Sequence, residues 1–278
     1  MHLKFRLGLT AFGHIGVFPE QAENWKFIYD TIKLAVGSKQ LAVNTGDSEP
    51  DPVIQSSSDP VIQSSSDPVI QSSSDPVIQS SSDPVIQHPV SGIRVLNLFA
   101  YTGGASLAAK AAGADVVHVD SVKQVINWAR EDMEVSNLEG IRWVIEDALK
   151  FVRREVKRGN KYDGIILDPP AYGRGPDGEK WILEDSINEM ISMCAELLSG
   201  QSAVGSSQWA IDNPQSPVTS HQSPFFILSL YSMGFSSLIG ESLVKSHFGT
   251  EREIQTGEFY FTDRAGRNLP LGTVTRFC

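Results

Sequence analysis

The stretch IRVLNLFAYTGG, residues 93–104, holds the pattern that decides the predicted fold. Its first part, Ile93–Phe99, is a short apolar run that fits a buried β-strand. The run leads to Gly103 and Gly104, which let the backbone turn tightly and open a helix. The alanine-rich segment that follows, residues 105–112, predicts that helix. A strand that turns directly into a helix is the unit from which alternating α/β folds are built.

Strand-like and helix-like runs alternate along much of the remaining chain. Strands are predicted at residues 93–99, 115–119, 141–145, 162–167, 225–230, 259–262 and 273–277, and helices at 105–112, 122–133, 148–156 and 183–198. The last two strands are expected to pair as a hairpin across a turn region at 266–272. The pattern predicts an α/β fold with a seven-stranded, mainly parallel sheet and a C-terminal antiparallel hairpin. Ligands are expected at the carboxyl ends of the strands.

A repeat interrupts this pattern. The pentapeptide Asp-Pro-Val-Ile-Gln occurs five times with a period of eight, from Asp51 to Gln87. Each unit offers only one Val and one Ile for burial, too little to offset the entropy of ordering the chain, and its proline blocks a long helix. We expect residues 47–91 to form a disordered low-complexity insert. An array of short motifs that binds a protein partner is the alternative.

The net charge of −10 is concentrated in this insert, which holds seven acidic and no basic residues. The remaining chain is near −3, so its charge does not exclude a nucleic-acid partner. Composition divides the chain into an N-terminal segment (1–46), the insert (47–91) and a core (92–278). Within the core, residues 200–223 are rich in Ser, Gln and Pro and are expected to form a flexible loop.

Several classes of protein are excluded by what the sequence lacks. No apolar run reaches the ~20 residues of a membrane helix, and Met1–Thr10 lack the apolar core of a signal peptide. We expect a cytoplasmic protein, with a mitochondrion or plastid as the alternative. With only Cys194 and Cys278, neither a disulfide scaffold nor a multi-cysteine zinc site is expected, and no metal site is predicted.

Acidic residues end the second and third predicted strands. Asp120 follows the second strand, where a carboxylate can accept both hydroxyls of a ribose. Asp147, with Glu146 as its neighbouring candidate, follows the third and can accept from an exocyclic amine such as that of adenine. For both aspartates the alternative is a helix N-cap, and both roles can hold together.

The fourth predicted strand runs directly into Asp168-Pro169-Pro170, followed by Tyr172. Two prolines fix the backbone and remove two donors, so we expect the local carbonyls to face whatever docks there. Together with Asp168 they can accept hydrogen bonds from an amino group, and Tyr172 can stack on a flat ring. A rigid turn without chemistry is the alternative.

These motifs, in this order and spacing, resemble those of class I S-adenosylmethionine-dependent methyltransferases. The similarity is greatest to bacterial large-subunit rRNA methyltransferases with the motifs N-x-F-x-Y-T-G-G and D-P-P-x-F/Y, here Asn97–Gly104 and Asp168–Tyr172. Gly16–Asn24 is similar to a stretch of that group, G-x-F-x-x-Q-x-x-N/R, that closes over the cofactor. The resemblance implies a Rossmann-like fold and S-adenosylmethionine as cofactor.

The resemblance also implies roles for particular residues. Thr102, Gly103 and Gly104 would cradle the methionine part, Asp120 would bind the ribose and Asp147 the adenine amine. The full cofactor-binding set is Phe18, Gln21, Asn97, Phe99, Tyr101, Thr102, Gly103, Gly104, Asp120, Ser121, Asp147 and Asp168. The catalytic set at the acceptor site is Asp168, Pro169, Pro170 and Tyr172.

The function expected from this resemblance is methyl transfer to RNA, at a base nitrogen in rRNA. The base would be flipped out, with Tyr172 stacking on it. Methylation at cytosine C5 is disfavoured, because Cys194 lies on the apolar face of a predicted helix. A basic run at residues 150–161 is expected on a solvated face, while Arg174 and Lys180 are better placed to meet a phosphate. The alternatives are a protein or small-amine methyltransferase and a catalytically inactive cofactor-binding scaffold.

Overall fold

The computed structural model of the chain describes residues 1–8, 16–44, 92–200, 224–231 and 234–278. The insert predicted at 47–91 and residues 201–223 of the predicted loop lie outside these ranges, so the expectations for them stay predictions. Within the described ranges, no helix combines the length and the apolar character needed to cross a bilayer.

Helices and strands alternate from residue 94 onward, as the pattern predicts. The helices are η1 (Pro19–Gln21), α1 (Ala22–Asn44), α2 (Gly104–Ala111), α3 (Lys123–Val135), α4 (Ala148–Lys157), α5 (Leu183–Leu197) and α6 (Ser237–Phe248). The strands are β1 (Arg94–Leu98), β2 (Asp115–Asp120), β3 (Ile141–Ile145), β4 (Gly164–Leu167), β5 (Tyr172–Arg174), β6 (Lys180–Ile182), β7 (Phe225–Leu230), β8 (Gln255–Thr262) and β9 (Asn268–Phe277).

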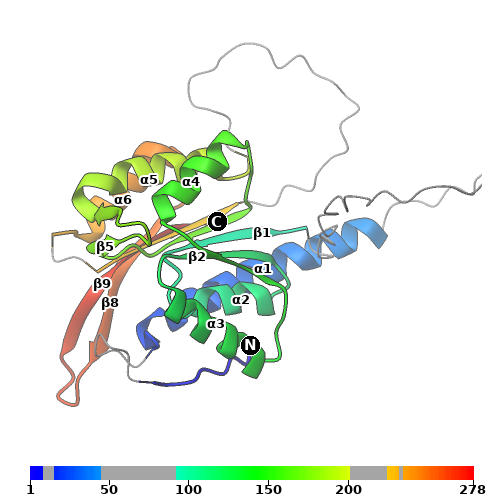
Figure 1. Cartoon of the computed structure of the whole chain (residues 1–278), viewed down its shortest axis with the longest axis horizontal. Coiled ribbons are helices and arrows are strands. Elements are labelled where there is room, and N and C mark those ends of the chain that lie inside the picture. Colours follow the sequence, from blue (N-terminus) through cyan, green and yellow to red (C-terminus); the bar gives the residue numbers. More distant parts are fainter. Residues whose placement is uncertain (9–15, 45–91, 201–223, 232–233) are drawn as a thin grey trace, which may run out of the picture.

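Seven of these strands form one sheet in the order β3-β2-β1-β4-β7-β9-β8 (Figure 1). The first five strands in this order, β3 to β7, are parallel to one another, whereas β9 is antiparallel to both β7 and β8. This arrangement confirms the predicted fold class. Because β1, β2 and β4 are parallel neighbours, the loops after them meet at one edge of the sheet.

Apolar side chains cover both faces of the sheet. On one face, Ile28 of α1 and Leu107 of α2 pack over the strands, and on the other Phe151 of α4 and Met190 of α5 do so. Figure 1 shows α1–α3 and α4–α6 as the two outer layers. Cys194 is fully buried in the second layer, and burial raises the pKa of its thiol. This placement confirms that it is a core residue.

The C-terminal hairpin is longer than predicted and its turn lies elsewhere. The turn region was expected at residues 266–272, whereas the chain reverses at 263–267 and β9 begins at Asn268. Pro270 lies inside β9, where a proline is unexpected. Before Thr273, however, β9 pairs only with β8, and such an edge tolerates proline.

Some elements carry no clear signal in the sequence. The three-residue strands β5 and β6 form a small separate hairpin directly after the Asp-Pro-Pro turn. Helix α6 begins after Ser236, whose hydroxyl accepts from the backbone N–H of Ile239 at 3.4 Å. The hairpin is too short for a period to show, and α6 has a weakly amphipathic pattern.

Candidate cofactor and acceptor site

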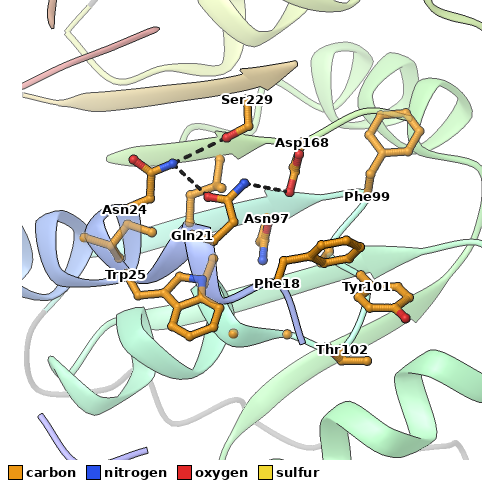
Figure 2. A pocket seen from close by; sticks show the side chains of 16 residues that line it. Phe18, Gln21, Asn24, Trp25, Asn97, Phe99, Tyr101, Thr102, Asp168 and Ser229 are labelled. Carbon is orange, nitrogen blue, oxygen red and sulfur yellow. Dashed lines mark hydrogen bonds between the residues drawn. The ribbon is translucent and has the colours of Figure 1, made fainter. Parts of the chain in front are cut away.

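Two cavities lie at the carboxyl ends of β1, β2 and β4 and share Phe99. The first is lined by Phe18, Gln21, Asn24, Trp25, Ile28, Asn97, Phe99, Ala100, Tyr101, Thr102, Gly103, Gly104, Ala105, Ile166, Asp168 and Ser229 (Figure 2). The second is lined by Phe99, Asp120, Ser121, Asp147, Ala148, Pro170, Gly173, Arg174 and Trp181. Every residue predicted to bind the cofactor therefore lines one of the two cavities.

The loop after β1 has an unusual backbone. Phe99 and Tyr101 adopt φ angles of 55° and 48°, and Gly103 follows at 83°. Left-handed conformations at non-glycine residues cost ~1–3 kcal/mol each and persist where neighbouring contacts enforce them. At Gly104 the constraint is space, since a Cβ there would collide with the ring of Trp25. The loop backbone thus packs closely against Trp25 of α1 and lines the first cavity.

Asp120 holds this loop in place. Its Oδ2 accepts from the backbone N–H of Tyr101 and its Oδ1 from that of Val122, both at 2.9 Å. Burial raises the pKa of Asp120, and these backbone donors partly offset the rise. The N-cap of α3 is Val122 itself, so Asp120 forms a turn before the helix instead of capping it.

Asp147 caps α4, as the alternative interpretation of the sequence had it. Its Oδ1 accepts from the backbone N–H of Lys150 at 2.9 Å, and no hydrogen bond to its Oδ2 occurs within the described residues. The neighbouring candidate Glu146 does not line the second cavity and forms an ion pair with Arg154. Asp147 can therefore cap the helix and still present one oxygen to the second cavity.

A buried polar chain supports the floor of the first cavity. Asn97 Nδ2 donates to Ser106 Oγ at 2.8 Å, and Ser106 Oγ lies 3.0 Å from Nδ1 of His118. Burial lowers the pKa of His118 to about 3. A hydrogen bond with the backbone of Tyr101 raises this pKa and offsets part of the effect. His118 is therefore neutral near pH 7, and its Nδ1 shares a hydrogen bond with the hydroxyl of Ser106. This chain fixes the orientation of the Asn97 amide.

Residues 16–21, directly before α1, lie over the first cavity. The hydroxyl of Thr102 donates to the carbonyl of Gly16 at 2.5 Å, which anchors the segment to the loop after β1. The rings of Phe18 and Tyr101 lie 5.3 Å apart. Gln21 Nε2 donates to Asp168 Oδ2 at 3.3 Å and to the hydroxyl of Tyr231 at 2.8 Å. Phe18 and Gln21 thus close the cavity above Asp168.

Asp168 is a buried carboxyl group whose pKa is strongly raised. Burial, and then the nearby charge of Glu20, raise its pKa to about 7. The expectation that the carbonyls after it would face a ligand is wrong for Pro170, whose carbonyl accepts from Trp181 Nε1 at 2.7 Å. Pro169 is buried. The tryptophan stiffens the turn that holds Asp168 in place.

Tyr172 lies apart from the other predicted site residues. Its side chain is 55% exposed on β5 and lines neither of the two cavities. Its hydroxyl accepts from Nε of Arg174 at 3.2 Å. In this structure the ring faces solvent next to the site, so its predicted stacking role stays a prediction.

The sequence did not single out several residues that line or support the cavities. These are Trp25, Ser106, His118, Trp181, Ser229 and Tyr231. Asn24 donates to Ser229 Oγ at 3.4 Å and to Gln21 Oε1 at 2.8 Å, which joins α1 to β7 (Figure 2). A polar residue inside an otherwise apolar predicted strand, such as His118 or Ser229, was the signal in the sequence that could have identified some of them.

The donors and acceptors of the two cavities fit the parts of S-adenosylmethionine. A carboxylate oxygen has capacity for about two hydrogen bonds, so Asp120 can hold the loop and still accept from a ribose. Asp147 offers an acceptor for an adenine amine in the second cavity, which Phe99 and Trp181 also line. Asn97 and the glycine loop face the first cavity, where a methionine end would lie.

Comparisons with known proteins agree with this assignment. The sequence profile of the S-adenosylmethionine-dependent methyltransferase family matches residues 82–220, half of the chain. The ribosomal RNA large subunit methyltransferase K/L of Shewanella frigidimarina is 35% identical over 112 residues, 39% of this chain and 15% of that protein. The ribosomal RNA large subunit methyltransferase I of Aeromonas hydrophila is 39% identical over 84 residues, 29% of this chain and 21% of that protein. The matches thus span about a fifth or less of these relatives.

A solved structure extends the similarity to the whole fold. The crystal structure of the SAM-dependent methyltransferase from Agrobacterium tumefaciens superposes with a TM-score of 0.66 and 29% identity, covering 99% of this chain and 67% of that one. The profile match, the sheet order and the glycine loop point to the same group of proteins. The chain belongs to the S-adenosylmethionine-dependent methyltransferase family.

Proposed function

We propose that this protein transfers the methyl group of S-adenosylmethionine to a nitrogen of an RNA base, in rRNA. The observation that carries the proposal is the position of Asp168. Its carboxyl group lies at the closed end of the first cavity, held by Gln21 and with a pKa near 7. The names of the relatives, which are rRNA methyltransferases, support RNA as the acceptor.

In this proposal the cofactor is held by residues at three strand ends. Asp120 accepts from the ribose, Asp147 accepts from the adenine amine, and Asn97 with the glycine loop holds the methionine part. When bound, the cofactor supplies a methyl group already activated by a sulfonium. The chain therefore has to supply alignment and exclusion of water more than bond polarisation.

The acceptor nitrogen would be aligned by Asp168. Its carboxylate accepts an N–H of the acceptor, which turns the nitrogen lone pair toward the methyl group. A nitrogen that gains a methyl group becomes more acidic, and a carboxylate with a pKa near 7 can take up the released proton. Phe18 and the Gln21–Tyr231 pair cover this position and keep water out.

The surroundings of the protein follow from the same proposal. Bacterial relatives that act on ribosomal RNA support the cytoplasm as its compartment, with an organelle as the alternative. The 47–91 repeats as a protein-binding array remain a second proposal, independent of the site.

Two measurements test the function. Isothermal titration should show binding of S-adenosylmethionine and none of NAD, and Asp120→Ala should weaken it. Transfer of a tritiated methyl group should then be found on unmodified large-subunit rRNA transcripts. Label on histone or on small amines, with none on RNA, would contradict RNA as the acceptor. Cofactor binding without transfer to any of these would favour an inactive scaffold.

A further inference from the structure

The β8–β9 hairpin extends beyond the edge of the sheet at which the two cavities lie. The pairing of β9 with β7 ends where Leu230, the last residue of β7, meets Thr273 of β9. Toward the turn, β9 continues for five more residues, paired only with β8. We call residues 259–272 the free end of the hairpin. Figure 1 shows it projecting away from the body of the sheet.

The base of the free end is fixed to the acceptor side of the first cavity. Phe259 is buried, and its ring stacks on that of Tyr231 with centroids 6.0 Å apart and an interplanar angle of 10°. The hydroxyl of Tyr231 accepts from Gln21, whose amide also donates to Asp168. Phe18 lies 6.2 Å from Tyr231 and continues the row of rings toward the cavity. Aromatic contacts thus lead from the cavity to the hairpin.

Beyond Phe259 the free end exposes large apolar side chains. Tyr260 is 54% exposed, Phe261 45% and Leu269 50%. Phe261 and Leu269 are cross-strand partners, so they share one face of the hairpin, while Tyr260 lies on the other. An exposed cluster of this kind on a projecting element is typical of an interaction surface.

The charge at the turn favours an anionic partner. Asp263 is paired with Arg267 at 2.7 Å, whereas Arg264 is exposed and forms no ion pair within the described residues. Aromatic rings beside an arginine are the combination that stacks on unpaired bases and contacts phosphate.

The basic groove along α4 offers a weaker surface for RNA. It is lined by Lys150, Arg153, Arg154, Lys157 and Lys180, among others. Three of these cations are already neutralised by acidic partners, as with Lys150 beside Asp177 and Arg153 beside Glu189. Those pairs leave less net charge for a phosphate. The helix thus agrees with the solvated face expected from the sequence.

We propose that the free end of the hairpin binds the single-stranded RNA next to the methylated base. One unpaired base stacks on Phe261 on one face of the hairpin, a second stacks on Tyr260 on the other face where the strand passes around the end, and Arg264 contacts a phosphate. This inference rests on the proposed RNA acceptor and adds the surface that selects an unpaired strand. The row from Phe259 to Phe18 joins that surface to the cavity that takes the base.

The test uses the full chain with the double variant Tyr260→Ala/Phe261→Ala. Affinity is measured for a fluorescent single-stranded RNA of about 12 nucleotides and for the matching duplex. The single strand should bind the wild type more tightly than the duplex, and the double variant should bind it about tenfold or more weakly. Leu238→Ala, which truncates a side chain 72% exposed on α6, serves as the matched control and should change nothing. The affinity for S-adenosylmethionine should stay within about twofold in both variants.

A second measurement needs no variant. Ultraviolet crosslinking of the same RNA to the wild type should label peptides from residues 259–272. Unchanged RNA affinity in the double variant, together with crosslinks outside residues 259–272, would overturn the hairpin assignment. The proposed function would still stand in that case if the wild type methylates RNA. A shift in sedimentation of the variant toward a smaller species would show that the surface holds a second copy instead. A wild type that neither binds nor methylates RNA would overturn both proposals.

Discussion

Asp168 is the ionisable side chain on which the proposed chemistry depends most. Only its carboxylate form can accept the hydrogen bond from the acceptor nitrogen and take up the proton released on methylation. Because its pKa is about 7, this form is lost as the pH falls below 7. Methyl transfer by the wild type should therefore rise between about pH 6 and 8 and then level off. Asp168→Asn should lower turnover about a hundredfold and remove this rise. The measurement is kcat against pH at saturating cofactor.

The same substitution has an internal control for folding. Because the folded-state pKa of Asp168 lies above its usual value, ionisation of this group opposes folding as the pH rises toward 7. Asn is neutral at every pH, so the Tm of the Asp168→Asn variant at pH 8 should equal or exceed that of the wild type. A lower Tm would mean that the loss of turnover reflects damage to the fold.

Ser106 links Asn97 to His118 beneath the first cavity, and Ser106→Ala tests that link. The substitution leaves a buried amide and a buried imidazole nitrogen without their shared partner, at a cost of about 1–3 kcal/mol. Urea unfolding should show that loss, and titration should show weaker binding of S-adenosylmethionine. Ser242→Ala, at an exposed site on α6, should change neither quantity. Equal stability of the two variants would show that the buried chain is not needed.

Helix α1 meets the glycine loop at one crowded contact. A Cβ at Gly104 would enter the ring of Trp25, whereas a Cβ at Gly37, in α1, would meet nothing within 4 Å. Gly104→Ala should therefore lower both the free energy of unfolding and the affinity for S-adenosylmethionine. Gly37→Ala should raise stability by about 0.5–1 kcal/mol, because it only adds helix propensity. Thermal melts and cofactor titrations of both variants check the pair, and equal effects would contradict the crowding.

Helices and strands with a clear pattern of apolar residues could be predicted from the sequence. Elements that form only because they pair or pack with distant segments could not. The observed bounds of β3 and β7 are those predicted, because each is a short, largely apolar run, fully buried in β7 and at the edge of the sheet in β3. The hairpin turn was misplaced because Gly266–Gly272 contains turn-forming residues, while the extension of β9 depends on its pairing with β8. Strands β5 and β6 exist because they pair with each other and because Trp181 packs on Phe99.

At the scale of the whole chain, the insert predicted at 47–91 is separable from the fold. Its composition predicts that it contributes no buried core, so replacing it with a short flexible linker should leave Tm and cofactor affinity unchanged. Differential scanning calorimetry of the deletion variant measures the first quantity and titration the second. A drop of several degrees in Tm would show that the repeats pack on the domain.

The sequence by itself determined the fold class, the family and the strand-end motifs from which the cofactor site is proposed. That was possible because strand-end motifs such as Asn97–Gly104 are local, and parallel strands bring their carboxyl ends to one edge wherever they pair. Only the tertiary structure decided what surrounds Asp168. Gln21 and Tyr231 are separated by 210 residues and meet only because α1 and β7 converge at that edge. The raised pKa of Asp168 follows from burial, which no local pattern encodes.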